Sequence, residues 1–251
     1  MPRERWGAPT MLPSDWAARL AYSTAYYRGL LANPAAAALA FRSDFGLFAS
    51  ELATCSGRVL DLGGGNGLVR EFLPHATDYV SLDPDRAWLE PPWQALAPWF
   101  PCVAKPPTFV CARAEAIPYK AEVFDVVLLL FSLNHCSDPA RAIEEAGRVL
   151  RPAGRLILVL EDVEPAWLDI WRGTYRDWRG WSRWRLALEK LKACAWGWPI
   201  EPDHMRITRQ QVARWARADF TVRARAWRAS YFLCDLERRR TSSDASGLES
   251  E

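Results

Sequence analysis

The chain has 251 residues, of which 50% are hydrophobic and 25% are charged, and its formal net charge is +2. This length suits one α/β domain with additions, and no uncharged run approaches the roughly 18 residues that span a bilayer. No apolar segment follows the N-terminal residues Met-Pro-Arg-Glu-Arg, so no secretory signal is expected. Six cysteines are scattered without a Cys-x-x-Cys pair. They argue against a disulfide framework and a metal site, and they favour reduced thiols in a cytoplasmic protein.

Charge is distributed unevenly along the chain. Residues 151–240 contain 19 basic and 11 acidic side chains, a difference of +8, whereas residues 1–150 contain 13 basic and 16 acidic ones. Such a basic region could attract an acidic substrate, nucleic acid or an anionic membrane surface, and an ordinary solvated surface is the simpler interpretation. No other feature supports nucleic acid, so no such partner is expected.

The N-terminal part of the chain predicts helices. Apolar and aromatic side chains recur at helical spacing over residues 14–54, and the pattern is interrupted at Asn33-Pro34. Tyr27 belongs to this pattern, and either core packing or contact with a ligand would explain it.

The most informative stretch covers residues 59–67. A short aliphatic run ends at Asp61, and a turn with four glycines follows: Gly63, Gly64, Gly65 and Gly67. Residues 58–62 predict a buried strand, and the glycines allow positive φ and close approach to a ligand. Residues 68–73 predict a helix whose N-terminal amides face the turn. This arrangement predicts a nucleotide or nucleoside pocket at the carboxyl edge of a parallel sheet.

A second strand is predicted at residues 79–82, and it ends at Asp83, twenty residues after Gly63. A carboxylate at this place can accept hydrogen bonds from both hydroxyls of a ribose. The alternative role is an N-cap for a helix that starts near Asp85. A dinucleotide fingerprint would need a third glycine at position 68, which is Leu68.

Residues 86–107 are rich in proline and tryptophan. Successive prolines remove backbone donors, so only the first turn or two of this segment should be helical.

The later segments point to one family. Residues 111–119 read Cys-Ala-Arg-Ala-Glu-Ala-Ile-Pro-Tyr, and residues 124–131 form the most apolar predicted strand. An amphipathic helix is predicted at 141–150, followed by Arg151-Pro152-Ala153-Gly154 and a strand over 155–159. In this order, and with the spacing Asp-x-Gly-x-Gly-x-Gly of the turn, these segments resemble the class I S-adenosylmethionine-dependent methyltransferases of the small-molecule subgroup.

The resemblance implies a Rossmann-like α/β fold. Its sheet would be mostly parallel with seven strands and an antiparallel C-terminal hairpin, beside a helical N-terminal cover and a Trp/Arg-rich helical insertion. S-adenosyl-L-methionine would be the cofactor, with Asp83 on its ribose. The implied cofactor residues are Asp61, Gly63, Gly64, Gly65, Gly67, Asp83, Pro84, Ala114, Glu115 and Phe131. Arg113 departs from the family pattern, because a guanidinium cannot accept the adenine N–H; either Glu115 or a backbone carbonyl would replace the usual acid, or Arg113 would stack on the ring.

The expected organisation has five parts. Residues 1–54 form the helical cover, 55–162 the cofactor-binding core, 163–207 an acceptor lid, 208–240 the last helix and hairpin, and 241–251 a disordered tail.

Aromatic and basic side chains recur at helical spacing within the expected lid. They could pack on the domain, bind a flat or anionic acceptor, or place residues 167–185 on a membrane surface. The expected acceptor residues are Tyr27, Trp167, Trp171, Arg172 and Tyr175.

Methyl transfer to a hydroxyl or amine requires a base. His135 is the first candidate because it follows the strand that would border the methyl group, and His204 is the second. A satisfied loop histidine is the alternative role for His135, and His75 is expected to be structural. The sequence leaves the acceptor, the methylated atom and the oligomeric state open. Two other functions compete, a non-catalytic scaffold with this fold and a nicotinamide enzyme.

Overall fold

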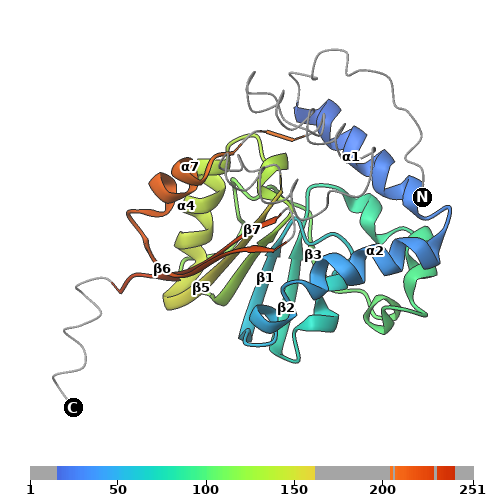
Figure 1. Ribbon diagram of the computed structural model, residues 1–251, viewed down its shortest axis with the longest axis horizontal. Coiled ribbons are helices and arrows are strands. Elements are labelled where there is room, and N and C mark those ends of the chain that lie inside the picture. The colour runs from blue at the N-terminus through green and yellow to red at the C-terminus, as the bar shows by residue number, and fades with distance from the viewer. Residues whose placement is uncertain (1–15, 162–203, 206, 229–230, 241–251) are drawn as a thin grey trace, which may run out of the picture.

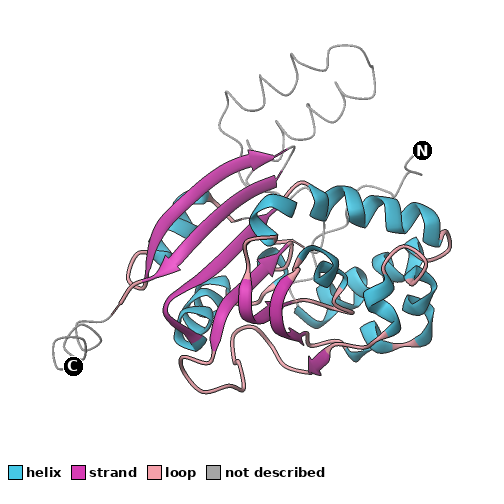
Figure 2. Ribbon diagram, turned by 90° about the horizontal axis from the view of Figure 1, so that it is seen from below, coloured by secondary structure: helices cyan, strands magenta, loops and turns pink. Residues whose placement is uncertain are grey.

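The computed structural model describes residues 16–161, 204–205, 207–228 and 231–240. These residues form a seven-stranded sheet with helices on both faces (Figures 1 and 2). The α-helices are α1 (Trp16–Leu30), α2 (Pro34–Gly46), α3 (Ala49–Leu52), α4 (Pro139–Val149) and α7 (Arg209–Ala216). The strands are β1 (Ser56–Leu62), β2 (His75–Leu82), β3 (Thr108–Val110), β4 (Phe124–Leu130), β5 (Leu150–Leu160), β6 (Phe220–Arg228) and β7 (Tyr231–Arg238).

The strand order is β3-β2-β1-β4-β5-β7-β6. Strands β1 to β5 pair in parallel, whereas β7 is antiparallel to both β5 and β6. The expected fold class, a mostly parallel sheet with an antiparallel C-terminal hairpin, is therefore confirmed. The order reverses at β1, between β2 and β4, which is where open α/β sheets place their ligand.

The core lies on both faces of the sheet because neighbouring residues of a strand point to opposite sides. On β1, Leu60 and Leu62 pack in the cluster that contains α4 and α7, while Val59 packs in the cluster that contains α3. Both clusters continue across β4 and β5, so the central strands are apolar on each side. Figure 1 shows α4 and α7 on one side of the sheet and α2 on the other.

Side-chain caps set several helix starts. The side chain of Asn33 accepts a hydrogen bond from the amide of Ala36 and begins α2, and that of Asp138 accepts one from Arg141 and begins α4. Thr208 and Gln211 form a capping box at α7. The break expected at Asn33-Pro34 is confirmed.

Two expectations about local structure are corrected. Residues 68–73 do not form an α-helix, and only the short 3₁₀ helix η1 (Leu68–Phe72) is present. The reason is Pro74, which disfavours helical geometry at the preceding residue. The segment after β2 is helical beyond its first turn or two. It contains three 3₁₀ helices, η2 (Arg86–Leu89), η3 (Pro91–Leu96) and η4 (Pro101–Ala104), and prolines begin the last two.

Most of the expected lid (163–207), including its Trp/Arg stretch, and the expected tail (241–251) lie outside the described residues. Within the described part of the chain, none of the helices is long and apolar enough to span a membrane.

Candidate active site

The four-glycine turn joins β1 to η1. Gly63, Gly65 and Gly67 have φ values of +76°, +50° and +75°, so three of the four occupy conformations that side chains disfavour. A Cβ atom on Gly63 would lie 2.5 Å from Cβ of Ser132, and one on Gly65 would lie 2.9 Å from the ring of Trp88. The turn therefore has both the backbone shape and the lack of space that require glycine.

Two buried carboxylates flank this turn. Asp61 is the second-to-last residue of β1 and is 4% exposed, and Asp83 follows β2 and is 5% exposed. The hydroxyl of Tyr79 donates to Oδ2 of Asp61 at 2.6 Å. The backbone amides of Gly65 and Asp85 donate to the two oxygens of Asp83, at 3.3 and 2.9 Å.

Burial raises the pKa of both Asp61 and Asp83 to about 7, even though the hydrogen bonds that they accept act in the opposite direction. The expected N-cap belongs to the neighbouring Asp85, whose side chain accepts from the amide of Ala87 and begins η2. Asp83 is therefore not the cap of that helix.

A cavity of about 210 Å³ lies at this edge of the sheet. Its wall includes Tyr27 and nine of the ten expected cofactor residues: Asp61, Gly63, Gly64, Gly65, Asp83, Pro84, Ala114, Glu115 and Phe131. Gly67 does not line the cavity. Its positive φ and its carbonyl, which accepts from Arg70 at 3.0 Å, place it at the far end of the turn.

Helix α1 lies across the ends of the strands (Figure 1), and its residues Trp16, Leu20 and Tyr27 line the cavity. The indole Nε1 of Trp16 donates to the carbonyl of His135 at 3.2 Å, and the hydroxyl of Thr24 donates to Asp85 at 2.5 Å. Tyr27 lies against Trp88, with 5.4 Å between the ring centroids. The cover is thus tied to both the glycine turn and the loop after β4.

Arg113 lies in the cavity wall. Its guanidinium lies 4.2 Å from the ring of Trp16 and donates to Glu115 and Ser137. Burial alone would raise the pKa of Glu115, but hydrogen bonds from Ser137, Arg113 and the amide of Asp138 outweigh it and lower the pKa. Oε1 of Glu115 accepts all of these bonds, so this carboxylate also holds the loop that begins α4.

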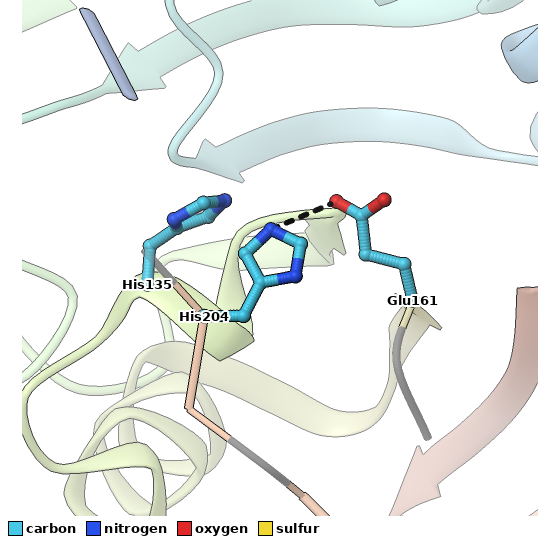
Figure 3. Close-up of side chains that lie close together, drawn as sticks. All are labelled: His135, Glu161 and His204. Atoms are coloured by element: carbon cyan, nitrogen blue, oxygen red, sulfur yellow. Dashed lines mark ion pairs between the residues drawn. The ribbon is translucent and has the colours of Figure 1, made fainter. Parts of the chain in front are cut away.

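Three side chains from distant parts of the chain meet beside the cavity: His135, Glu161 and His204 (Figure 3). The two imidazole rings lie edge to face with 4.6 Å between their centroids. Nε2 of His204 is 3.5 Å from Oε1 of Glu161. His135 and Glu161 line the cavity, whereas the side chain of His204 is 5% exposed and lies behind them.

Asn134 holds these three segments together. It is completely buried, and its Nδ2 donates to the carbonyls of Glu161 at 2.9 Å and Met205 at 3.1 Å. The amide of Met205 donates to the carbonyl of Asn134 at 2.7 Å. Sequence reasoning identified the two histidines but missed Glu161 and Asn134. A polar residue directly before His135 and an acid directly after β5 were the available signals.

Four of the expected acceptor residues, Trp167, Trp171, Arg172 and Tyr175, lie outside the described residues. Tyr27 is the one that the structure places, and it lies in the cavity wall.

A family model described as a methyltransferase domain matches residues 60–158. An uncharacterized methyltransferase of Mycobacterium bovis is 40% identical over 110 residues, which are 43% of this chain and 41% of that protein. A ubiquinone/menaquinone biosynthesis C-methyltransferase of Hahella chejuensis is 49% identical over 57 residues, 23% of this chain and 22% of that protein. The chain thus spans less than half the length of these relatives.

A crystal structure described as an S-adenosylmethionine-dependent methyltransferase of Thermotoga maritima superposes with a TM-score of 0.55. It is 16% identical in sequence, and the match covers 90% of this chain and all of that one. This similarity supports the fold. The glycine turn and its two carboxylates lie within the segment that matches the methyltransferase domain model.

Proposed function

We propose that the protein is an enzyme that transfers the methyl group of S-adenosyl-L-methionine to a small-molecule acceptor. The observation that carries the proposal is one cavity with two walls of different chemistry. The glycine turn with Asp61 and Asp83 forms the wall suited to a nucleoside, and His135 with Glu161 forms a wall suited to proton removal.

The residues of the first wall fit the cofactor. Asp83 would accept hydrogen bonds from the ribose hydroxyls, and it is fixed for this role by the amides of Gly65 and Asp85. The cofactor would lie along Gly63, Gly64 and Gly65, which line the cavity without side chains. The remaining expected residues, Asp61, Gly64, Gly67, Pro84, Ala114, Glu115 and Phe131, are proposed to shape or support the same wall.

The cofactor supplies an electrophilic methyl group whose leaving group is a neutral thioether. The protein therefore has to align the acceptor and exclude water. Helix α1 suits the second task because Trp16, Leu20 and Tyr27 close the cavity from above. Arg19, which also lines the cavity, would favour an acceptor with an anionic or strongly polar group.

Proton removal is assigned to the second wall. His135 would take the proton of the acceptor as the general base, since it lines the cavity while His204 lies behind it. His204 and Glu161 would orient its ring. The expected acceptor residues Trp167, Trp171, Arg172 and Tyr175 are proposed to complete the site as a lid. A cytoplasmic location, reduced thiols and no nucleic-acid partner remain part of this proposal.

Thermal denaturation with added ligands tests the cofactor. S-adenosylmethionine at about one hundred times its dissociation constant should add about 2.7 kcal/mol to the free energy of unfolding, and NAD should add none. Asp83→Ala should abolish the effect. The matched control is Asp78→Ala on the same strand, whose carboxylate pairs with Arg58 on the surface.

Mass-detected methylation of a small-molecule library tests the enzyme. His135→Ala should bind the cofactor normally and lose turnover. Cofactor binding without any methylated product would support the scaffold alternative instead, and stabilisation by NAD would support a nicotinamide enzyme.

A further inference from the structure

His135, Glu161 and His204 present two imidazoles and one carboxylate to the same small volume (Figure 3). One ligand atom of each side chain can be chosen so that all three lie within 4.8 Å of one another. We propose that these three residues bind a divalent transition-metal ion at the edge of the cofactor cavity. The proposal rests on the proposed function only for what the ion does in catalysis.

The distances suit a metal site that closes on its ion. Metal–nitrogen and metal–oxygen bonds of about 2.1 Å place neighbouring ligand atoms of a tetrahedral site about 3.4 Å apart. His204 and Glu161 are already at this spacing, with 3.5 Å between Nε2 and Oε1. The 4.8 Å limit for the whole set leaves movements of about an ångström, which side-chain rotation supplies.

Hydrogen bonds fix the backbone around these three residues. Asn134 links the carbonyls of Glu161 and Met205 through its own amide group, so one buried side chain fixes the neighbours of all three ligands. The carbonyl of His135 also accepts a hydrogen bond from Trp16. Metal sites depend on such supporting hydrogen bonds, because these bonds orient the ligands before the ion arrives.

The ligand types indicate the class of metal. Two imidazoles and one carboxylate, with further positions open, are typical of catalytic zinc and of mononuclear non-haem iron. A site for magnesium or calcium would use oxygen ligands almost alone. Cys136 also lines the cavity, but its sulfur is not part of the group of ligand atoms within 4.8 Å of one another.

The ion would change how the acceptor loses its proton. Both imidazoles would be occupied as neutral ligands, and a hydroxyl of the acceptor would bind at an open metal position. Such an ion would supply Lewis-acid activation, which would lower the pKa of that hydroxyl and let its proton pass to water. The oxyanion, or the carbon of its enolate form, would then bond to the methyl carbon while the carbon–sulfur bond breaks and its electron pair stays on sulfur. An acceptor with a phenolic or enolic hydroxyl fits this chemistry best.

Cobalt binding to the untagged full-length protein provides the test. After treatment with a chelator, the protein is titrated with Co²⁺ under calorimetry and visible absorption, and Zn²⁺ and Mn²⁺ follow as competitors. One ion per chain is expected, with absorption bands for nitrogen and oxygen ligands. His135→Asn, His204→Asn and Glu161→Gln should each weaken binding by about 100-fold or more, since even the loss of a supporting group costs 10- to 100-fold.

The chain provides its own control, because its remaining histidine, His75, lies exposed at the start of β2. His75→Asn should bind cobalt like the unaltered protein. Equal affinity in the three ligand variants, a thiolate charge-transfer band, or no stoichiometric binding would overturn the proposal. A circular dichroism spectrum and a cooperative thermal transition like those of the unaltered protein show that each variant is folded. Cobalt binding without any methylated product would support the metal site and refute the proposed function. Full turnover by protein free of metal would support the proposed function and refute a catalytic role of the ion.

Discussion

Cofactor affinity should depend on pH through Asp83. Burial holds the pKa of this carboxyl at about 7 when no ligand is present, so a substantial fraction is protonated near neutrality. Only the ionised form can accept hydrogen bonds from both ribose hydroxyls. Binding therefore selects the ionised form, and affinity should fall as the pH falls through the pKa.

The magnitude follows from the ionised fraction. For one carboxyl with a pKa of about 7, this fraction is about 0.9 at about pH 8 and about 0.1 at about pH 6, so affinity should fall about tenfold. If Asp61, whose pKa is also about 7, must ionise as well, the loss approaches one hundredfold.

Isothermal titration calorimetry across this range measures the effect, and repeating it in two buffers with different ionisation enthalpies counts the protons released. The α-amino group of the cofactor titrates nearby, at about 7.7–8.0. Comparison with Asp83→Asn, measured in parallel, isolates the contribution of Asp83, because the α-amino group of the cofactor contributes equally to both titrations. The reasoning would be refuted by a pH dependence of affinity that is the same in the variant and the unaltered protein.

Further predictions concern stability as well as binding. Gly65→Val should abolish cofactor stabilisation in thermal denaturation, because its Cβ would lie 2.9 Å from the ring of Trp88. In Gly29→Ala the new Cβ would meet no atom within 4 Å, so this variant should stabilise the protein by about 0.5–1 kcal/mol. Ala153→Gly should raise the urea midpoint by the equivalent of about 1 kcal/mol, since Ala153 has a φ of +62°; an unchanged midpoint would contradict this. Asn134→Ala should lower the free energy of unfolding by about 1–3 kcal/mol in the same assay because two backbone carbonyls lose their donor, and a smaller loss would show that water replaces it.

Much of the fold follows from local patterns. The central strands are apolar on both faces. The glycine turn, Asp61 near the end of β1 and Asp83 after β2 are local signals in the chain. Ala153 shows that a non-glycine residue can also take a left-handed conformation, at a cost in strain.

Other features depend on contacts that the sequence does not display. Arg113 is held by Trp16, whose position depends on how α1 lies across the sheet. His204 meets His135 because Asn134 bridges segments that are 27 and 71 residues away along the chain. Neither spacing forms a recognisable motif, so Glu161 and the grouping of the three side chains could not be predicted.

The position of α1 has a consequence for kinetics. Ser23 is the one residue of this helix that is buried. Tyr27 and Leu30 pack on a hydrophobic cluster, and polar contacts are made by Trp16, Thr24 and Arg28. A helix with so little buried surface can lift at modest cost. We therefore expect nucleoside exchange to be limited by the opening frequency of α1, with a release rate that increases with ionic strength.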